Sequence, residues 1–330
     1  MRKIALVLTM ALLVSVAVFA GAQAEAQAGK AFTPSKNIEW YVTSSPGGGS
    51  DIFTRTIMDI AVAEDLLNKQ NVVVQYKTDG AGEVGRLLVS QIRAGVQADH
   101  TLLTFNSGDL MPMVKNTNNR FENFQAIAHM AVDKHLIFVG EMSKYKSFEE
   151  VLAALKRGER MVLGGSKGDD IACHAALIAE LGVTQDQLSY IAHDATSGAI
   201  TAILGGHFDL LISKPAAASQ YVEAGKITPI LALSTSRFPG NLNSAPTLSE
   251  FGYKNVEVPN WRSIVAPKSM SAEAVAYWTD VFKKVSATET WNKGYIEKQK
   301  LVPDYMDAAT FTTYGMNFQK EYLASIGKDK

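Results

Sequence analysis

The stretch Ile38–Asp51, IEWYVTSSPGGGSD, decides the fold of this chain. Its first half, Ile38–Thr43, reads as a buried strand, and the glycine-rich turn Pro46–Asp51 follows at once. A helix is predicted next, because apolar residues recur at helical spacing. They are Ile52, Phe53, Ile57, Ile60 and Ala61. A strand, a glycine-rich turn and a helix in this order open an α/β unit.

The unit continues with two more strands. Val72–Tyr76 is a second predicted strand, a helix is expected at about residues 84–93, and Thr101–Phe105 is a third strand. This is a βαβαβ unit, and such units have parallel strands.

The same order recurs later in the chain. The predicted strands are Met161–Leu163, Leu188–Ile191 and Asp209–Ser213. The turn Gly164–Gly168 follows the first of them, and helices are expected at about residues 170–181 and 198–204. Because only two copies are present, we expect two duplicated α/β lobes rather than a solenoid.

Two apolar segments are candidates for the connections between the lobes. Leu136–Val139 is predicted to cross to the second lobe and Val256–Ser263 to cross back. Helices at about residues 271–287 and 290–300 would then pack on the first lobe. The prediction is therefore a discontinuous first lobe, residues 37–135 plus 262–330, and a second lobe, residues 136–261.

The first residues predict export. Arg2 and Lys3 precede the apolar run Ile4–Ala20, and small residues follow it. A membrane anchor is the alternative, but the run is shorter than the roughly 20 residues of a spanning helix. We therefore predict a signal peptide over residues 1–24, cleavage near Ala22, Ala24 or Ala26, and a periplasmic location.

Composition excludes several classes of function. The 32 Lys and Arg residues nearly balance the 33 Asp and Glu residues, so no basic field exists for nucleic acid or an anionic membrane surface. The single cysteine, Cys173, can form no internal disulfide and lies too far from the signal peptide to carry a lipid anchor. We expect it to be buried.

Each glycine-rich turn joins the carboxyl end of a strand to the start of a helix. Free backbone N–H groups and the helix dipole favour an anion there, and open α/β sheets bind ligands at that end. Ser50 and Asp51 can cap the first helix or contact a ligand, and Ser166 and Lys167 add a hydroxyl and a cation. The alternative is that both turns are glycine-rich only because they are tight.

Known catalytic and nucleotide patterns fit poorly. Neither turn has the G-x-G-x-x-G or P-loop pattern. Gly164–Gly168 does satisfy G-x-S-x-G, so a secreted serine hydrolase with Ser166 as nucleophile is an alternative. That alternative needs a late histidine, but none lies beyond His207. We therefore predict no enzymatic activity.

No cofactor or metal is predicted. Asp170 and His174 stand four residues apart on one helical face, but no third ligand has recognisable spacing. His174 is interpreted as a ligand contact or as a partner within its helix. His193 and Asp194 are assigned to a cleft loop with Ser197 and Gly198, with a solvated loop as the alternative.

In these motifs the chain resembles the solute receptors of tripartite tricarboxylate transporters, often called the TctC or Bug family. The resemblance begins with the turn Pro46–Asp51 and Arg55 and continues through the chain. The further matching pieces are Gly80–Gly82, Leu102-Leu103 before Asn106-Ser107, Gly165-Ser166 with His174, Leu204–Gly206 with Asp209-Leu210, Ala224–Lys226, Ala245–Glu250, and Trp261 ahead of Ala266-Pro267.

The resemblance implies a periplasmic-binding-protein-like (Venus flytrap) fold with two doubly wound α/β lobes joined by crossover strands. It implies that a small organic carboxylate binds in the cleft and is delivered to integral membrane large and small transporter subunits. The predicted ligand-binding residues are Gly48, Gly49, Ser50, Asp51, Asn106 and Ser107 in the first lobe, and Ser166, Lys167, Gly168, His174, Ser197, Gly198 and Ser213 in the second.

Three departures from the family pattern leave the ligand open. Ser44 stands where an aromatic residue is frequent, His193 where a tyrosine is common, and Arg262 where a small or apolar residue is usual. Lys167 or Arg262 would pair with a second carboxylate, unless it is a solvated surface charge. We expect a monomeric receptor for a mono-, di- or tricarboxylate. A binding protein that reports to a membrane sensor would have the same sequence signature.

Overall fold

The computed structural model describes residues 31–328, and the chain from Pro34 onward forms one compact unit. The predicted signal peptide, residues 1–24, lies outside the described residues. Within residues 31–328 no helix is both long and apolar enough to cross a bilayer.

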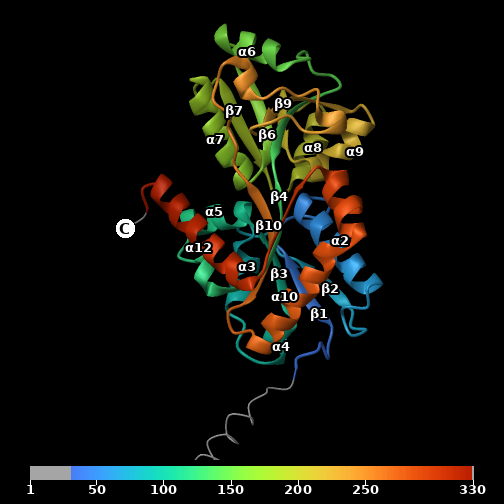
Figure 1. The fold of residues 1–330 in the computed structure, drawn as a ribbon. Helices are drawn as coiled ribbons and strands as arrows, with labels where there is room; N and C mark the ends of the chain where they lie inside the picture. Colours follow the sequence, from blue (N-terminus) through green and yellow to red (C-terminus); the bar gives the residue numbers. More distant parts are fainter. Residues whose placement is uncertain (1–30, 329–330) are drawn as a thin grey trace, which may run out of the picture. The chain divides into compact units, whose positions relative to one another are not determined.

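The compact unit contains two sheets (Figure 1). The six-stranded sheet has the order β11-β4-β10-β3-β1-β2 and the five-stranded sheet the order β7-β6-β8-β5-β9. The strands of the first are β1 (Ile38–Val42), β2 (Val72–Tyr76), β3 (Thr101–Asn106), β4 (Phe124–Asp133), β10 (Asn260–Pro267) and β11 (Val302–Met306). Those of the second are β5 (His135–Gly140), β6 (Met161–Ser166), β7 (Leu188–His193), β8 (Leu210–Ser213) and β9 (Ile227–Leu233).

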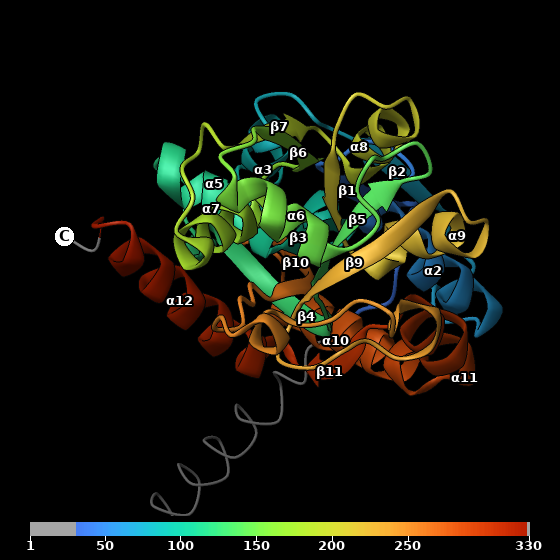
Figure 2. The same ribbon diagram turned by 90° about the horizontal axis from the view of Figure 1, so that it is seen from above.

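Helices cover the sheets. The helices that come before β4 are α2 (Gly49–Ala63), α3 (Glu83–Ser90), α4 (Val96–Asp99) and α5 (Ser107–Asn116). Those between β5 and β9 are α6 (Phe148–Lys156), α7 (Asp169–Leu181), α8 (Thr196–Leu204) and α9 (Pro215–Glu223). The last ones are α10 (Ala272–Ala287), α11 (Glu289–Trp291) and α12 (Ala308–Ser325). Seen from above, α12 lies beside α5 at one side of the unit, which agrees with their packing contact (Figure 2).

Both predicted βαβαβ units form. β1 pairs in parallel with β2 and β3, and β6 pairs in parallel with β7 and β8. The two lobes are therefore mixed α/β layers in which the carboxyl ends of the parallel strands carry the turns, as the periodicity predicted.

The connections differ in detail from the prediction. Leu136–Val139 does not cross between the sheets, because it lies inside β5; the chain leaves the first sheet at Asp133 and enters the second at His135. The return strand β10 begins at Asn260 and pairs with β4 and β3. The helix expected at residues 290–300 forms, with helical backbone from Glu289 to Gln299, but its middle, Asn292–Glu297, is π-helical rather than α-helical.

Each lobe has its own apolar core. In the first lobe Trp261 is fully buried and its ring lies 5.5 Å from the rings of Phe311 and Phe318. In the second lobe Cys173 is buried among residues such as Leu163 and Leu177, which confirms the expectation of a buried thiol. Aromatic and aliphatic burial of this kind is the main stabilising contribution to such lobes.

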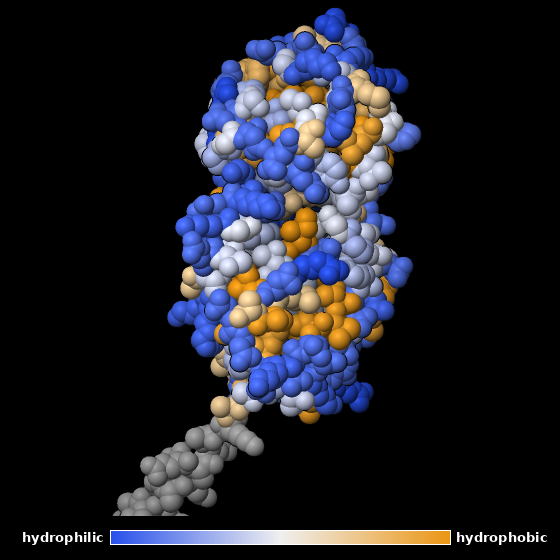
Figure 3. Space-filling view, turned by 90° about the vertical axis from the view of Figure 1, so that its right-hand side faces the viewer, coloured by the Kyte–Doolittle hydropathy of each residue, from blue (hydrophilic) through white to orange (hydrophobic). Residues whose placement is uncertain are grey.

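The face of the unit seen in Figure 3 is mostly polar, with apolar residues grouped over part of the first lobe. Large exposed apolar side chains of this lobe include Val62 in α2 and Val73 in the edge strand β2.

Candidate functional site

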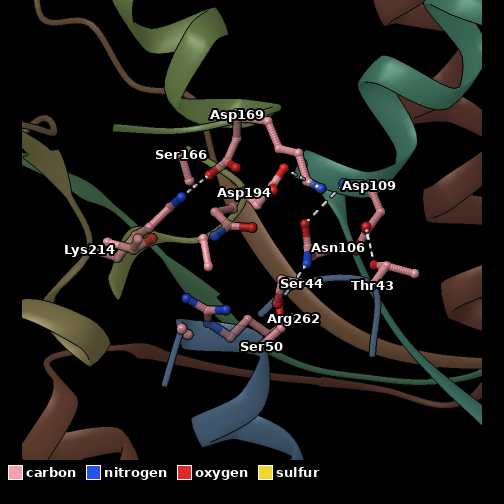
Figure 4. A pocket seen from close by; sticks show the side chains of 17 residues that line it. Thr43, Ser44, Ser50, Asn106, Asp109, Ser166, Asp169, Asp194, Lys214 and Arg262 are labelled. Atoms are coloured by element: carbon pink, nitrogen blue, oxygen red, sulfur yellow. Dashed lines mark hydrogen bonds and ion pairs between the residues drawn. The ribbon is translucent and has the colours of Figure 1, made fainter. Parts of the chain in front are cut away.

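A cavity lies where the first turns of the two lobes face each other (Figure 4). The centres of water-sized molecules can occupy about 50 Å³ of it. Its lining residues are Thr43, Ser44, Gly48, Gly49, Ser50, Asn106, Gly108, Asp109, Ser166, Lys167, Asp169, Asp194, Ala195, Thr196, Lys214, Asn260 and Arg262.

The turn after β1 forms one wall of the cavity. Helix α2 has Gly48 at its N-cap, and no side chain caps it. Its first N–H groups are therefore free of the usual capping oxygen and point toward the end of the helix where an anion is favoured. Gly48, Gly49 and Ser50 line the cavity as expected.

Asp51 does not line the cavity. Its carboxylate accepts hydrogen bonds from the Gly47 N–H (2.8 Å), the Arg55 Nε (2.9 Å) and the Tyr76 hydroxyl (2.6 Å). Of the two roles predicted for Asp51, the structure therefore gives it one close to capping: it fixes the shape of the turn and ties α2 to β2.

The carboxyl end of β3 supplies the second wall. Asn106 caps α5 through its Oδ1, which accepts from the Asp109 N–H, and its Nδ2 donates to the Ser50 Oγ at 3.2 Å. Asp109 accepts from the Thr43 hydroxyl (2.6 Å) and the Arg86 guanidinium (2.9 Å). Ser107 lies outside the cavity, and its hydroxyl donates to the Pro259 carbonyl at 3.0 Å.

The second-lobe turn faces these groups. Ser166 and Lys167 line the cavity, and the Ser166 hydroxyl donates to Asp170 Oδ2 at 2.7 Å. Gly168 is not in the lining but meets the first lobe directly, since an added Cβ would lie 2.3 Å from the Gly108 carbonyl oxygen. The two lobes therefore touch through glycine backbones beside the cavity.

Behind the second turn lies a buried cluster of charges: His135, Asp169, Asp170 and Lys214. Lys214 Nζ lies 2.7 Å from Asp169 Oδ2 and 2.5 Å from Asp170 Oδ1, and His135 Nε2 contacts the same two oxygens at 2.8 and 3.0 Å. Burial alone would lower the pKa of His135, but the electrostatic interaction with Cys173 and the hydrogen bonds to the two carboxylates outweigh it and raise that pKa well above its ordinary value.

The same contacts set the charges of the other members. Burial would raise the pKa of Asp169, but the Lys214 ammonium outweighs it and holds that pKa well below the usual range. The pKa of Lys214 is correspondingly raised against the effect of burial. The cluster therefore holds two carboxylates and two cations.

His135, Asp169 and Asp170 are also grouped closely enough to suggest a metal site. The Lys214 ammonium lies within 2.7 Å of an oxygen of each carboxylate, so it already supplies the cation between them. This donor set does not fit a metal ion. The pair of ligands considered from the sequence, Asp170 and His174, is not brought together: His174 Nε2 contacts the Leu188 carbonyl oxygen at 2.7 Å.

Arg262 reaches the cavity from β10. Its guanidinium forms an ion pair with Asp133 at the end of β4, and both side chains are almost fully buried. Burial alone would lower the pKa of Arg262, but the Asp133 carboxylate raises it. Arg262 is thus not the solvated surface charge that the sequence left open. It also explains Gly49, because an added Cβ there would lie 2.6 Å from Arg262 Nη2.

Three buried polar atoms in the cavity wall have no hydrogen-bond partner among the described residues. They are the Ser44 Oγ, the Lys167 Nζ and the Arg262 Nε. Lys167 Nζ has one longer ion contact, 3.7 Å to Asp194 Oδ1, and burial lowers its pKa although Asp109 and Asp194 oppose this. Unpaired donors in a buried wall are costly, and a bound anion would satisfy them.

The remaining predicted residues lie outside the cavity. His174 is buried under Tyr190, with ring centroids 5.1 Å apart. The Ser197 hydroxyl donates to the Pro46 carbonyl at 3.2 Å and so joins the lobes. Gly198 packs against His193, whose ring meets Phe208, and the Ser213 hydroxyl donates to the Lys214 carbonyl at 3.2 Å.

Several lining residues were missed, and some had a signal in the sequence. Asp109 and Lys214 follow the carboxyl ends of β3 and β8, where the same rule that selected the two turns applies. Asn260 lies on a crossover strand that is antiparallel to its neighbours, and no comparable rule selects it.

The geometry gives no support to a serine hydrolase. The Ser166 hydroxyl donates to a carboxylate, and the histidine beyond that carboxylate, His135, is fully buried. A nucleophilic serine needs a base within hydrogen-bond reach, usually a histidine.

Two α/β lobes with a polar cavity between the carboxyl ends of their parallel strands define a two-lobed binding protein. The family model for the tripartite tricarboxylate transporter family receptor, TctC, matches residues 58–322. The chain belongs to this family, whose members are substrate-binding proteins rather than enzymes.

Relatives support this assignment. The chain is 28% identical over 312 residues to a UPF0065 protein in the gbd 5' region of Cupriavidus necator, covering 92% of this chain and 90% of that protein. It is 25% identical over 248 residues to a UPF0065 protein of Pseudomonas sp. strain P51, covering 73% and 71%.

Solved structures share the fold. The periplasmic binding protein BugD superposes with a TM-score of 0.79 at 19% identity, covering 90% of this chain and 98% of that chain. MatC from Rhodopseudomonas palustris, solved with bound malate, gives 0.76 at 15% identity, covering 88% and 98%. An R. palustris protein solved with adipate gives 0.76 at 16% identity, covering 89% and 98%. These similarities confirm the predicted periplasmic-binding-protein-like fold.

Proposed function

We propose that this protein is a periplasmic receptor that binds a small organic carboxylate between its lobes and delivers it to a tripartite tricarboxylate-type membrane transporter. The observation that carries the proposal is the set of unpartnered donors in the cavity wall, which come from both lobes. Oriented donors at a helix N-terminus and on buried cations are the groups that recognise carboxylates.

Family and fold support the same conclusion. The chain is a TctC-family receptor, and the structural relatives include proteins solved with malate and with adipate. Both of those ligands are carboxylates, and carboxylate recognition by this chain is the simplest reading of its own cavity.

In the proposed binding cycle, the two lobes open to admit the ligand and close around it. We infer that the two turns move apart to admit the ligand, which then favours the state in which both turns contact it. The cycle needs lobe boundaries close to those expected from the sequence, residues 37–135 plus 262–330 and 136–261, and the chain passes between the two sheets after Asp133 and before Asn260.

A thermal-shift screen of the mature chain against organic acids tests carboxylate binding. A ligand at a hundred times its Kd stabilises the folded state by about 2.7 kcal/mol, so a true ligand raises Tm by several degrees. An uncharged amide of each acid is the control. If no carboxylate raises Tm, or if acids and amides act alike, the proposal is wrong.

Delivery to a transporter is tested separately. The tagged receptor, loaded with its carboxylate, should retain the large and small integral membrane subunits from detergent-solubilised membranes of its own host. Retention of a membrane sensor instead would assign the protein to signalling. A monomer is expected in light scattering with and without the ligand.

A further inference from the structure

The unpartnered donors of the cavity belong to two different lobes. Arg262 lies on the crossover strand β10 beside the first-lobe turn, and Lys167 belongs to the second-lobe turn between β6 and α7. Arg262 Nε and Lys167 Nζ are both buried without a hydrogen-bond partner among the described residues. They are therefore two separate points at which a ligand can be recognised.

The first point combines several donors. Arg262 Nη2 is used by Asp133, but its Nε–H is free, and the guanidinium packs against Gly49 at the start of α2. The N-terminus of α2 and the Ser44 hydroxyl lie in the same wall. A carboxylate placed here would accept hydrogen bonds from a helix end, a hydroxyl and a guanidinium at once.

The second point is the Lys167 ammonium. Its side chain is 16% exposed, and its carboxylate neighbour, Asp194, is 3.7 Å away and 71% exposed. That contact is too long for a hydrogen bond, so most of the donor capacity of Lys167 is unused. A second anionic group next to Nζ would restore the partner that burial has removed.

The charges that line the cavity limit the ligand to two such groups. Three lining side chains are cations, Lys167, Lys214 and Arg262, and three are carboxylates, Asp109, Asp169 and Asp194. Lys214 is already bonded to two carboxylates and Arg262 to one. A third ligand carboxylate would meet no cation with free capacity and would face the three lining carboxylates.

We propose that the ligand is a short dicarboxylate, held with one carboxylate at Arg262 and the α2 turn and the other at Lys167, and that tricarboxylates are rejected. This assignment rests on the proposed function, because it specifies the ligand of the same cavity. Lys167 and Arg262 are then the residues that determine specificity.

Isothermal titration calorimetry with matched acids tests the assignment. Malonate, succinate and glutarate provide three lengths, and the tightest of them is compared with its own half-amide, which has the same shape but one negative charge. We expect the dicarboxylate to bind about ten- to a hundredfold tighter than its half-amide, as for loss of a hydrogen bond between charged groups. Tricarballylate, which adds a third carboxylate to glutarate, should bind at least about tenfold more weakly than the best dicarboxylate.

The variant Lys167→Gln assigns the second carboxylate to its residue. We expect the dicarboxylate to lose about ten- to a hundredfold in affinity and the half-amide to change by less than about twofold, because only the dicarboxylate uses Nζ. Lys284→Gln is the control, since Lys284 is an exposed lysine on α10 and its loss changes the net charge equally. An equal loss for both ligands would overturn the assignment of Lys167.

The outcomes separate the two levels of the proposal. If no acid binds, the carboxylate receptor itself is wrong. If monocarboxylates or tricarballylate bind as tightly as the best dicarboxylate, the receptor function stands and the two-point recognition is wrong. Circular dichroism of Lys167→Gln shows whether the variant is folded; should it be unfolded, Lys167→Arg, which keeps the charge, must retain the preference for the dicarboxylate.

Discussion

Arg262 and its neighbour Trp261 lie next to each other on β10 but contact different parts of the protein, the cavity and the apolar core. Successive side chains of a strand point to opposite faces, so Trp261 packs into the aromatic core and Arg262 points into the cavity. The buried guanidinium depends on Asp133 for its charge balance. If Arg262 binds the ligand as we propose, the pair couples ligand recognition to the stability of the junction between β4 and β10.

Asp133→Asn removes that charge balance. We expect a loss of about 3–5 kcal/mol in the free energy of unfolding, because a buried guanidinium is left without its carboxylate. Urea denaturation followed by circular dichroism measures the loss. The double variant Asp133→Asn with Arg262→Gln should recover a large part of it, and failure to recover would show that the charge of Arg262 is not the cause.

At this scale the sequence predicted part of the site. Gly48, Gly49, Ser50, Asn106, Ser166 and Lys167 line the cavity as expected, because each follows the carboxyl end of a parallel strand. Asp51, Ser107, His174 and Ser213 carry polar groups that bond within the protein instead. Residue type and position cannot distinguish these two uses, since both need the same donors and acceptors.

At the scale of elements, the contact between the starts of α5 and α7 decides how closely the lobes approach. Gly108 lies at the start of α5, and an added Cβ would be 2.4 Å from Asp169 Oδ1. Gly168, the N-cap of α7, has φ +83° and meets the Gly108 backbone. Neither glycine leaves space for a side chain in this arrangement.

Gly108→Ala tests this contact without backbone strain, because Gly108 is helical and has no positive φ. Separation of the lobes can relieve the contact with Asp169, but the added Cβ would also lie 2.9 Å from Asn106 Oδ1, which caps α5 in the same lobe. We therefore expect the ligand-free protein to lose no more than about 2 kcal/mol in free energy of unfolding, the cost of a disturbed cap. Ligand affinity should fall at least about tenfold, because the closed arrangement is blocked.

The control is Gly294→Ala, whose Cβ would meet only Thr290 at 3.8 Å. Calorimetry gives the affinity of both variants, and urea denaturation gives their stability. Equal affinities for Gly108→Ala and the wild type would show that this contact is not part of ligand binding.

The elements themselves were largely predictable. Strong periodicity and glycine-rich turns identified both βαβαβ units, and parallel pairing confirmed them. The crossing was assigned to the apolar segment Leu136–Val139, but it lies at the polar residues Asp133, Lys134 and His135, which a search for apolar segments passes over. The helix expected at residues 290–300 is present, but the π-helical geometry of its middle, Asn292–Glu297, has no distinct sequence pattern and was not predicted.

For the whole folded unit, the pKa shifts in the buried cluster of His135, Asp169, Asp170 and Lys214 lead us to expect a defined pH range of maximal stability. The pKa of Asp169 is lowered in the folded protein, so its contribution is complete above its ordinary pKa of about 3.9 and is lost as pH falls further. The pKa of His135 is raised, so its contribution is complete below about pH 6.5 and is lost as pH rises through the folded value.

We therefore expect the free energy of unfolding to be greatest between about pH 4 and 6.5 as far as this cluster determines it. Urea denaturation from pH 4 to 9 measures the profile. His135→Asn should be less stable at pH 6 and should lose the decline above pH 6.5 that His135 causes. Direct titration of the imidazole by NMR is the independent check, and an imidazole that titrates near pH 6.5 or below would contradict the prediction.

The one-residue crossing at Lys134 has a mechanical consequence. The two connections between the lobes lie side by side, since Asn260 at the start of β10 pairs with Asp133 at the end of β4. Two adjacent connections can act as a hinge. A small rotation of one lobe relative to the other then displaces each residue by a distance that grows with its distance from the hinge. If the lobes rotate about these connections as the proposed binding cycle requires, their far ends, near α6 and α4 in Figure 1, move further than the two turns beside the cavity, and the change in shape on binding is largest there.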